Sequence, residues 1–530
     1  MILRLANVVS PQAHVARGAT YIFVQGFLNA ALGVLYVWFL LHTKEIAGQI
    51  LFTESDFGLF TILSLILTLT STLGILALKS ASVRYIAHYL AGGKEAEARS
   101  VVARVLQVSA ITSSAIAVSL FLMAGSLANI FDSSVYIFYF LPISSVIQIF
   151  YFQAQGFLQG LQRMREIAAL GLLYTLVQYF VGVTLIYLGF GVLGIVIGWL
   201  FALSLSCLIA LSLAFRTIGI SRHTHDLKPL LAFSAPIYVT NLLTSIVGWV
   251  DQIFIFPFMG IEALGVYNLA VRASVVPNLI SNAIVVSLFP KLSELHSALG
   301  TQSLRDAFKT STRYAALLGF PLALMVATLA YPITVLFATV RFVDAVIPLA
   351  VMCVASVPTI LGSAIFPTLF ALTRTRIASL ITMTSIVLEA FISYIALAHF
   401  GAGLVGVAFS RLFASLAVLV LGAYVLWASL KVEFDKEAVW KSAAAAILMV
   451  ISLFALEFSR GFLAPSSYQF LVLRLRQLPI YVAVGVTVYL LSLVAFKAVK
   501  QRDVELLNDY LPQRLQWIAR LVNRVAQSAE

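Results

Sequence analysis

Long apolar runs are the feature of this sequence that most limits how the chain can fold. A helix of about 20 apolar residues crosses the hydrocarbon core of a bilayer, whereas a membrane-spanning strand needs only about 9–11 residues of alternating polarity. Inside hydrocarbon, only helices and closed barrels satisfy their own backbone hydrogen-bonding groups. The runs in this chain are too long and too uniformly apolar for barrel strands. The sequence therefore predicts an all-α, polytopic membrane protein.

About fourteen transmembrane helices can be placed on these runs. Their predicted bounds are 18–41, 57–78, 105–127, 135–159, 167–188, 191–215, 231–257, 264–289, 314–337, 343–371, 377–398, 403–428, 439–458 and 479–496. The composition agrees with this prediction, because 61% of the residues are hydrophobic and 11% are charged. Ordinary globular domains have roughly 45–50% apolar and 25% charged residues, so a water-soluble fold is excluded.

The positions of lysine and arginine predict the orientation. If the N-terminus is cytoplasmic, 27 of the 34 basic residues fall in inner segments and five in outer ones. Basic residues collect in cytoplasmic loops, so we expect a multi-pass protein of the plasma membrane with both termini in the cytoplasm. The net charge of +12 then reflects loops that face anionic membrane lipids, and no nucleic-acid partner is expected.

The sequence also repeats itself at a nearly constant spacing. Three pairs of short motifs carry the repeat: 57–60 with 264–267, 161–165 with 372–376, and 191–194 with 403–406. Their offsets are 207, 211 and 212 residues, and each motif occupies the corresponding span of its half. Each half contains six spans, an even number, so the halves should be related by an axis along the membrane normal.

This repeat predicts three domains. Residues 1–228 form an N-terminal six-helix bundle and residues 229–430 a second, parallel one. Residues 431–530 add two helices and a cytoplasmic amphipathic tail. A cavity between two such bundles favours transport by alternating access, in which one bundle rocks against the other.

The motifs of the second half resemble those of a known family. Residues 264–267 (Leu-Gly-Val-Tyr) lead into Ala270-Val271-Arg272, and the span ends in residues 289–293 (Phe-Pro-Lys-Leu-Ser). Together with the six-plus-six-plus-two span pattern, they resemble the polysaccharide flippases. That family belongs to the multidrug/oligosaccharidyl-lipid/polysaccharide exporter superfamily, which also contains lipid II flippases and drug exporters.

The resemblance implies a function and a site residue. Such proteins move polyprenyl-pyrophosphate-linked oligosaccharides from the inner to the outer leaflet for the assembly of surface polysaccharide. Arg272 matches an arginine that faces the central cavity in the lipid II branch. The first span lacks the charge typical of the lipid II branch, and it lacks the aspartate of many cation-coupled drug exporters.

Four full charges stand out within the predicted spans, and two of them lie in neighbouring spans of the second half. Each costs about 2.5–3.5 kcal/mol at the bilayer centre unless it finds a partner or water. At 3.6 residues per turn, two polar faces result: Asn241, Asp251 and Gln252 on one span, and Asn268, Arg272 and Asn282 on the next. These faces predict the lining of a wet substrate cavity. The alternative is that Asp251 and Arg272 only pair with each other.

Glu389 and Arg411 are the other two charges. A rise of 1.5 Å per residue places both about 18 Å from the inner face, on adjacent spans. They can therefore form an ion pair, which is either a structural clasp or part of a site that couples transport to H⁺ or Na⁺.

No motif for catalysis or for a bound cofactor is present. The sequence has no GxxxxGK[ST], no HExxH and no CxxC pair, which argues against a P-loop ATPase and against a metal site. We therefore expect neither an enzyme nor a cofactor. The alternative to a lipid-linked oligosaccharide flippase is a cation-coupled drug or metabolite exporter of the same superfamily, or a membrane scaffold that transports nothing.

Overall fold

Helices and the turns between them make up the whole described part of the chain. The computed structural model describes residues 11–219, 221, 223–279, 300–372, 374–459 and 478–498, and no strand occurs in these ranges. The predicted all-α fold is confirmed.

The described helices include 12 that are long and apolar enough to cross a membrane, or 13 if a bent pair counts as one span. That pair, Leu304–Thr328 and Ala330–Ala338, meets at 68°. One of the 12 is the 53-residue stretch Leu227–Leu279, which contains the predicted span 231–257 and overlaps most of the next, 264–289. The count of fourteen remains a prediction.

The chain divides into two compact units. The first contains Met1–Trp249 and Met259–Val266, and the second contains Val250–Phe258 and Tyr267–Glu530. The domain bounds predicted from the sequence, 1–228, 229–430 and 431–530, remain predictions.

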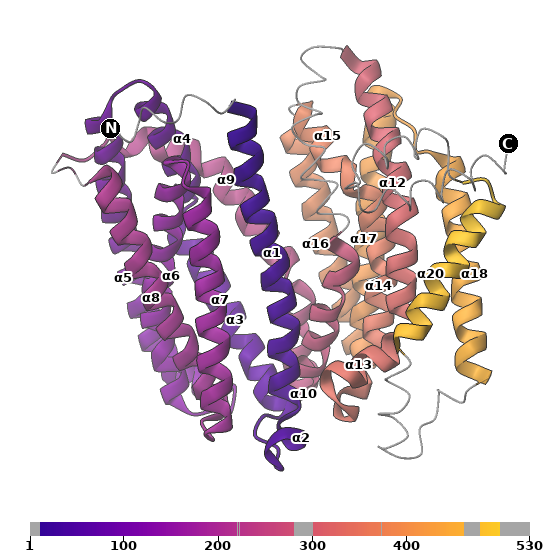
Figure 1. Cartoon of the computed structure of the whole chain (residues 1–530). Helices are drawn as coiled ribbons and strands as arrows, with labels where there is room; N and C mark the ends of the chain where they lie inside the picture. The colour runs from indigo at the N-terminus through magenta and orange to yellow at the C-terminus, as the bar shows by residue number, and fades with distance from the viewer. Residues whose placement is uncertain are drawn as a thin grey trace. The chain divides into compact units, whose positions relative to one another are not determined.

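The first unit is built from nine helices of the described residues (Figure 1). They are α1 (Pro11–Leu41), α2 (Thr43–Ala47), α3 (Glu54–Ile75), α4 (Leu78–Ala91), α5 (Glu95–Ile130), α6 (Val135–Gly160), α7 (Met164–Tyr187), α8 (Gly191–Ile218) and α9 (Leu227–Val247).

The bounds of α3 follow from local chemistry. A capping box begins the helix: the Thr53 hydroxyl accepts from the Asp56 amide (3.2 Å), and the Asp56 carboxylate accepts from the Thr53 amide (2.8 Å). The helix ends where Leu76 and Ala77 both adopt the left-handed conformation, with φ of 48° and 53°. This break allows α4 to begin in a new direction.

Small residues bring α7 and α8 of the first unit together. Gly194 and Gly198 are four residues apart on α8, and a Cβ at Gly198 would lie only 2.9 Å from the Gly182 amide nitrogen of α7. Close helix approach is the usual role of small residues at this spacing in membranes. The larger core side chains, such as Tyr151, Phe157 and Leu203, are buried between α4, α6 and α8.

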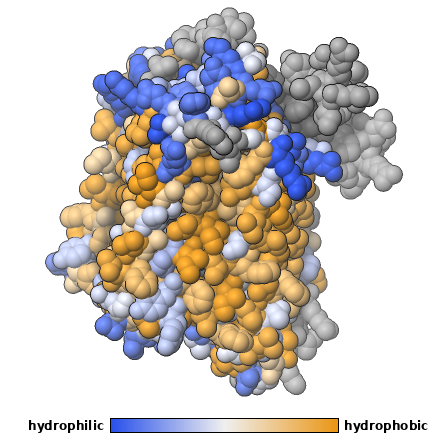
Figure 2. Space-filling model, turned by 90° about the vertical axis from the view of Figure 1, so that its left-hand side faces the viewer, coloured by the Kyte–Doolittle hydropathy of each residue, from blue (hydrophilic) through white to orange (hydrophobic). Residues whose placement is uncertain are grey.

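The outer surface carries large apolar side chains. Leu122 and Phe180 are each 75% exposed and Ile111 is 71% exposed. Figure 2 shows a face that is hydrophobic across its middle, with hydrophilic side chains gathered at its upper end. Exposed apolar area of this extent indicates contact with lipid rather than water.

The second unit begins within α10 (Val250–Ala273) and continues through the described helices to residue 498. These are α12 (Gly300–Thr328), α13 (Ala330–Ala338), η3 (Val340–Ala345), α14 (Val346–Leu361), η4 (Gly362–Ala364), α15 (Ile365–Ala371), α16 (Thr375–Ala398), α17 (Gly403–Leu430), α18 (Lys436–Ser459) and α20 (Leu478–Ala495). Tyr481 and Tyr489 of α20 lie in a core that α12 and α18 complete.

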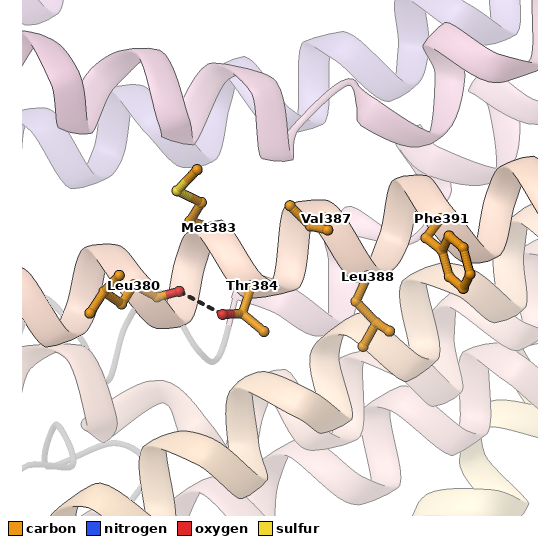
Figure 3. A pocket seen from close by; sticks show the side chains of 6 residues that line it. All are labelled: Leu380, Met383, Thr384, Val387, Leu388 and Phe391. Carbon is orange, nitrogen blue, oxygen red and sulfur yellow. Dashed lines mark hydrogen bonds between the residues drawn. The ribbon is translucent and has the colours of Figure 1, made fainter.

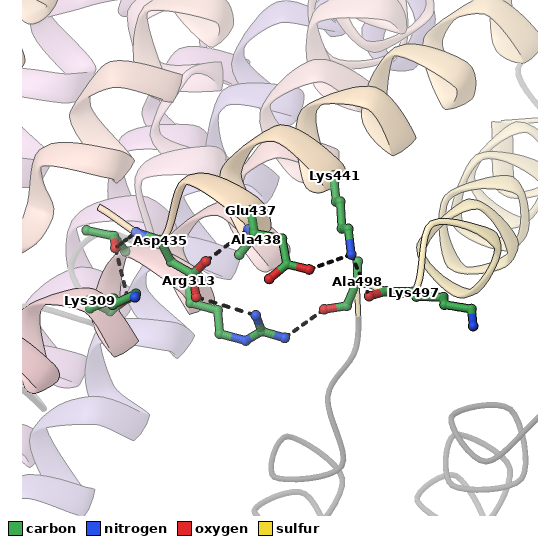
Figure 4. A network of polar contacts seen from close by, with 9 residues as sticks. Lys309, Arg313, Asp435, Glu437, Ala438, Lys441, Lys497 and Ala498 are labelled. Atoms are coloured by element: carbon green, nitrogen blue, oxygen red, sulfur yellow. Dashed lines mark hydrogen bonds and ion pairs between the residues drawn. The ribbon is translucent and has the colours of Figure 1, made fainter. Parts of the chain in front are cut away.

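A buried ion pair fastens the last two described helices to α12 (Figure 4). Arg313 of α12 contacts Asp435 (3.5 Å), and their side chains are 7% and 10% exposed. Arg313 also donates to the Ala498 carbonyl oxygen (2.6 Å), just beyond α20. Asp435 in turn accepts from the Ala438 amide (3.1 Å) in the first turn of α18. One guanidinium therefore ties three helices together.

Replacing Arg313 by alanine should destabilise the protein strongly, because it leaves the Asp435 carboxylate buried without its cation. Breaking such a pair costs about 3–5 kcal/mol of unfolding free energy. Thermal unfolding in detergent micelles measures the loss. The control is Arg99→Ala, which removes an exposed pair with Glu95 and should cost about 1 kcal/mol or less. Equal melting curves for the two variants would contradict the role given to Arg313.

Candidate functional site

The element α10 folds back on itself at Gly260. That residue has φ of 85° and ψ of −178°, which lies outside the helical region and suits glycine. Two hydrogen bonds cross the break. The Tyr267 hydroxyl donates to Asp251 Oδ2 (2.8 Å), and Asn268 Nδ2 donates to Gln252 Oε1 (2.9 Å). Residues 16 apart on a straight helix would be separated by roughly 24 Å. These contacts therefore require a hairpin centred on Gly260.

Asp251 lies near the start of the first arm of this hairpin and is completely buried. Three groups donate to its carboxylate. The Gln252 backbone N–H donates to Oδ1 (2.9 Å). The Tyr267 hydroxyl and Arg411 Nη1 (2.7 Å) donate to Oδ2. One of the three donors is a guanidinium, so the contact between Asp251 and Arg411 is a charge-assisted hydrogen bond.

Arg411 comes to this site from α17, and Glu389 comes from α16. Glu389 is 4% exposed, and its Oε1 accepts no hydrogen bond within the described part of the chain. Asp251 and Arg411 both lie close enough to act on it electrostatically. The sequence led us to expect that Arg411 pairs with Glu389. In the structure, the carboxylate that Arg411 contacts is Asp251.

Arg272 is connected to the same hairpin through neutral amides. Its Nε donates to Asn268 Oδ1 (2.7 Å), one helical turn earlier, and Asn268 donates to Gln252. Gln252 and Asn268 are each only 3% exposed. The structure therefore brings Gln252, Asn268 and Arg272 together as predicted neighbours. Two series of hydrogen bonds therefore lie next to each other. One links Gln252, Asn268 and Arg272, and the other links Arg411, Asp251 and Tyr267, each of the latter two being one residue before Gln252 and Asn268 in the sequence.

Two other predicted site residues are not part of this arrangement as described. Asn241 is exposed on α9 in the first unit. The sequence argument placed it on one continuous helical face with Asp251, but the helix is interrupted by a turn at Gly248 and Trp249. Asn282 lies outside the described residues.

Sequence reasoning missed Tyr267, which counted only as part of a repeated motif. A signal for it does exist in the sequence. Pro257 and Gly260 interrupt the apolar run, and a hairpin centred between residues 259 and 260 pairs positions 251 and 252 with 267 and 268. If the span is treated as one continuous helix, these positions do not come together, and the pairing is not predicted.

The exposed side of α16 forms an apolar groove of about 370 Å³ (Figure 3). Leu380, Met383, Val387 and Phe391 line it at helical spacing, and the Thr384 hydroxyl is turned back to the Leu380 carbonyl (2.9 Å). Glu389 is buried on another face of the same helix. The helix thus separates a surface suited to acyl chains from the polar site.

The first unit has its own cation near the end of α3. Lys79 Nζ donates to the neutral Gln155 side chain (3.1 Å) and lies 5.5 Å from the centre of the Phe152 ring. Burial lowers the pKa of the Lys79 ammonium below its usual value. Hydroxyl pairs of this unit, Thr70 with Ser145 (3.3 Å) and Thr72 with Ser245 (3.2 Å), carry no charge.

Solved structures of membrane transporters share this fold. The chain resembles the lipid II flippase MurJ in its inward closed conformation, with a TM-score of 0.71 and 15% identity over 89% of this chain and 98% of that one. It also resembles an inward-facing multidrug resistance MATE family transporter of the MOP superfamily, with a TM-score of 0.62 and 17% identity over 77% of this chain and 95% of that one. The fold is that of MOP superfamily membrane transporters.

The sequence comparison identifies the family. The family model described as "Polysaccharide biosynthesis protein" matches residues 51–347, which is more than half of the chain. The chain belongs to this family. Its fold is shared with the solved lipid II flippase and the solved multidrug transporter described above.

A curated relative agrees with this family. The teichuronic acid biosynthesis protein TuaB of Bacillus subtilis (strain 168) is 27% identical over 136 residues. The matched segment covers 26% of this chain and 28% of the relative.

Proposed function

We propose that this protein moves a polyprenyl-pyrophosphate-linked oligosaccharide from the inner to the outer leaflet for surface polysaccharide assembly. The family match supports a role in polysaccharide biosynthesis. The observation that carries the substrate class is the buried amide chain of Gln252 and Asn268, which holds Arg272. A pyrophosphate brings two or more negative charges, and an unpaired charge in an apolar cavity costs several kcal/mol. A positioned guanidinium meets that need.

Alternating access between two six-helix bundles is the mechanism that we propose. Residues 1–228 and 229–430 would form these bundles, and 431–530 the added helices and tail. Arg272 would bind the phosphates, and Asn241, Gln252, Asn268 and Asn282 would bind polar groups of the headgroup. A cation, H⁺ or Na⁺, would drive the cycle through Asp251, Glu389 and Arg411.

Purified protein in liposomes tests this function. A short-chain polyprenyl-pyrophosphate oligosaccharide placed in one leaflet should appear in the other, as measured by its accessibility to an added glycosidase. Protein-free liposomes are the control. A protein that leaves this lipid in place but moves cationic drugs would be an exporter instead.

We also propose that the protein lies in the plasma membrane with both termini in the cytoplasm. Replacing Lys94, in the turn between α4 and α5, by cysteine tests the orientation in a chain whose two native cysteines are changed to alanine. A membrane-impermeant maleimide should label Lys94→Cys only after the cells are permeabilised. Ser134→Cys, between α5 and α6, should be labelled in intact cells. The reverse pattern would overturn the orientation.

A further inference from the structure

Two buried carboxyl groups of the second unit, those of Asp251 and Glu389, lie near one guanidinium, that of Arg411. Asp251 accepts from Arg411, Tyr267 and the Gln252 amide, so its charge is well compensated. Glu389 is nearly as buried, but its Oε1 receives no donor from the described residues. An ionised carboxylate is costly in a buried position when one of its oxygens accepts no hydrogen bond. The neutral acid avoids most of that cost.

No neighbouring side chain among the described residues donates a hydrogen bond to Glu389 Oε1. Ser385 and Ser393 lie one turn before and after it on α16. The Ser385 hydroxyl donates to the Thr382 carbonyl (2.7 Å), and the Ser393 hydroxyl pairs with that of Ser410 on α17 (2.7 Å). The charged and titratable groups that interact electrostatically with Glu389 from the other packed elements are Asp251 and Tyr267 of α10 and Arg411 of α17.

We propose that Glu389 is the proton-binding group of the transport cycle, and that Arg411 moves from Asp251 towards Glu389 when that proton leaves. This inference rests on the proposed transport function and names its coupling ion. With Glu389 protonated, Asp251 and Arg411 balance each other. When the proton passes to water, two carboxylates face one guanidinium, and the site carries one net negative charge. A guanidinium has five donors and can bind both carboxylates at once.

The hairpin at Gly260 carries this change to Arg272. Asp251 precedes Gln252, and Tyr267 precedes Asn268, so the two hydrogen bonds across the hairpin lie side by side. Weakening the Arg411–Asp251 contact frees Asp251 to shift with Tyr267. That shift moves the adjacent Gln252–Asn268 pair, which holds Arg272. Protonation of Glu389 and anion binding by Arg272 are thereby coupled through Asp251 and Gln252 on the first arm of the hairpin and Tyr267 and Asn268 on the second.

The alternative ion, Na⁺, fits these groups less well. Hard cations are bound by several oxygen ligands, and here a permanent guanidinium already lies against the Asp251 carboxylate. A metal ion would need several oxygen ligands beside Glu389, whereas a proton needs only the Glu389 carboxylate itself.

Infrared difference spectroscopy of the purified protein tests proton binding without any transport. Wild-type protein near neutral pH should show the C=O stretch of a buried protonated carboxyl group. The band should disappear in Glu389→Gln and remain in Glu166→Gln, which alters a partly exposed carboxylate of α7. A wild-type spectrum without the band, or a band that survives in Glu389→Gln, would overturn the proposal.

Flux measurements then test coupling in liposomes that enclose a pH-sensitive dye. In wild-type protein, a pH gradient should accelerate movement of the lipid-linked oligosaccharide, and protons should flow with it. Glu389→Gln should lose both the acceleration and the proton flux, yet still equilibrate the lipid slowly without a gradient. Unchanged gradient dependence in Glu389→Gln, or acceleration by Na⁺ alone, would reject the proton site. A wild-type protein that moves no such lipid would reject the proposed function, while the infrared result would still decide the proton site.

Discussion

Replacing Arg272 by alanine should abolish transport of a pyrophosphate-linked oligosaccharide while the protein still inserts at normal levels. Removing one partner of a buried, hydrogen-bonded charge pair costs about 2–5 kcal/mol, which is a roughly 30-fold to several-thousand-fold loss in substrate binding. Arg272 Nε donates to the neutral Asn268 side chain, so the variant leaves an amide oxygen, not a charged group, without this donor. The liposome assay measures the rate, and membrane fractionation measures the amount inserted.

Two further variants separate charge from geometry. Arg272→Lys keeps the positive charge but loses the two-pronged fork that matches phosphate, so it should retain only part of the activity. Arg216→Ala removes an exposed arginine at the end of α8 and should transport normally. Normal transport by Arg272→Ala would show that Arg272 serves only to hold Asn268.

Much of the fold was predictable because it depends on local properties. A run of 20 or more apolar residues can hardly form anything but a membrane helix, and the described helices overlap those runs. The exception in detail is α10 (Val250–Ala273), which crosses the predicted boundary between two spans. The close approach of α7 and α8 likewise has a local signal, the four-residue spacing of Gly194 and Gly198. Such features need no knowledge of which helices are neighbours.

The pairing of buried charges was less predictable because it depends on tertiary contacts. Depth along a helix placed Glu389 and Arg411 at the same level, but the ion pair that Arg411 forms in the structure is with Asp251. Depth cannot say which of two carboxylates a long guanidinium reaches, and the hairpin at Gly260 brings Asp251 into range. The same hairpin supplies Tyr267, which a search for charged residues in spans passes over.

The repeated motifs meet each other in the first unit. Gly58 of α3 lies against the Ile261 backbone, and Gly265 lies against the Glu54 backbone. Gly265 is 207 residues after Gly58, and Ile261 is 207 residues after Glu54, so the two contacts join equivalent positions of the repeat. The Ser55 hydroxyl donates to Glu262 (3.0 Å), again at an offset of 207. Contacts between equivalent positions are what a two-fold relation produces near its axis. They support the predicted repeat, which elsewhere remains a prediction.

Valine at Gly58 should separate the two segments at this crossing. A Cβ built there overlaps the Ile261 carbonyl oxygen and lies 2.9 Å from the carbonyl carbon, and backbone atoms cannot swing aside as a side chain can. Overpacking typically costs about 1–3 kcal/mol, and moving the segment apart avoids that cost. Cysteines at Ser55 and Glu262, in a chain without Cys207 and Cys353, report the separation, because a disulfide forms only between close Cβ atoms.

Oxidation should therefore cross-link the Ser55→Cys/Glu262→Cys protein efficiently, and Gly58→Val should reduce the yield to background. Gly125→Val is the matched control, because a Cβ at Gly125 of α5 meets nothing within 4 Å, so its cross-link should form as before. Gel filtration in detergent shows whether each variant remains folded. Efficient cross-linking in a folded Gly58→Val protein would mean that the helices tolerate the added volume. The glycines would then have to be explained by something other than this crossing.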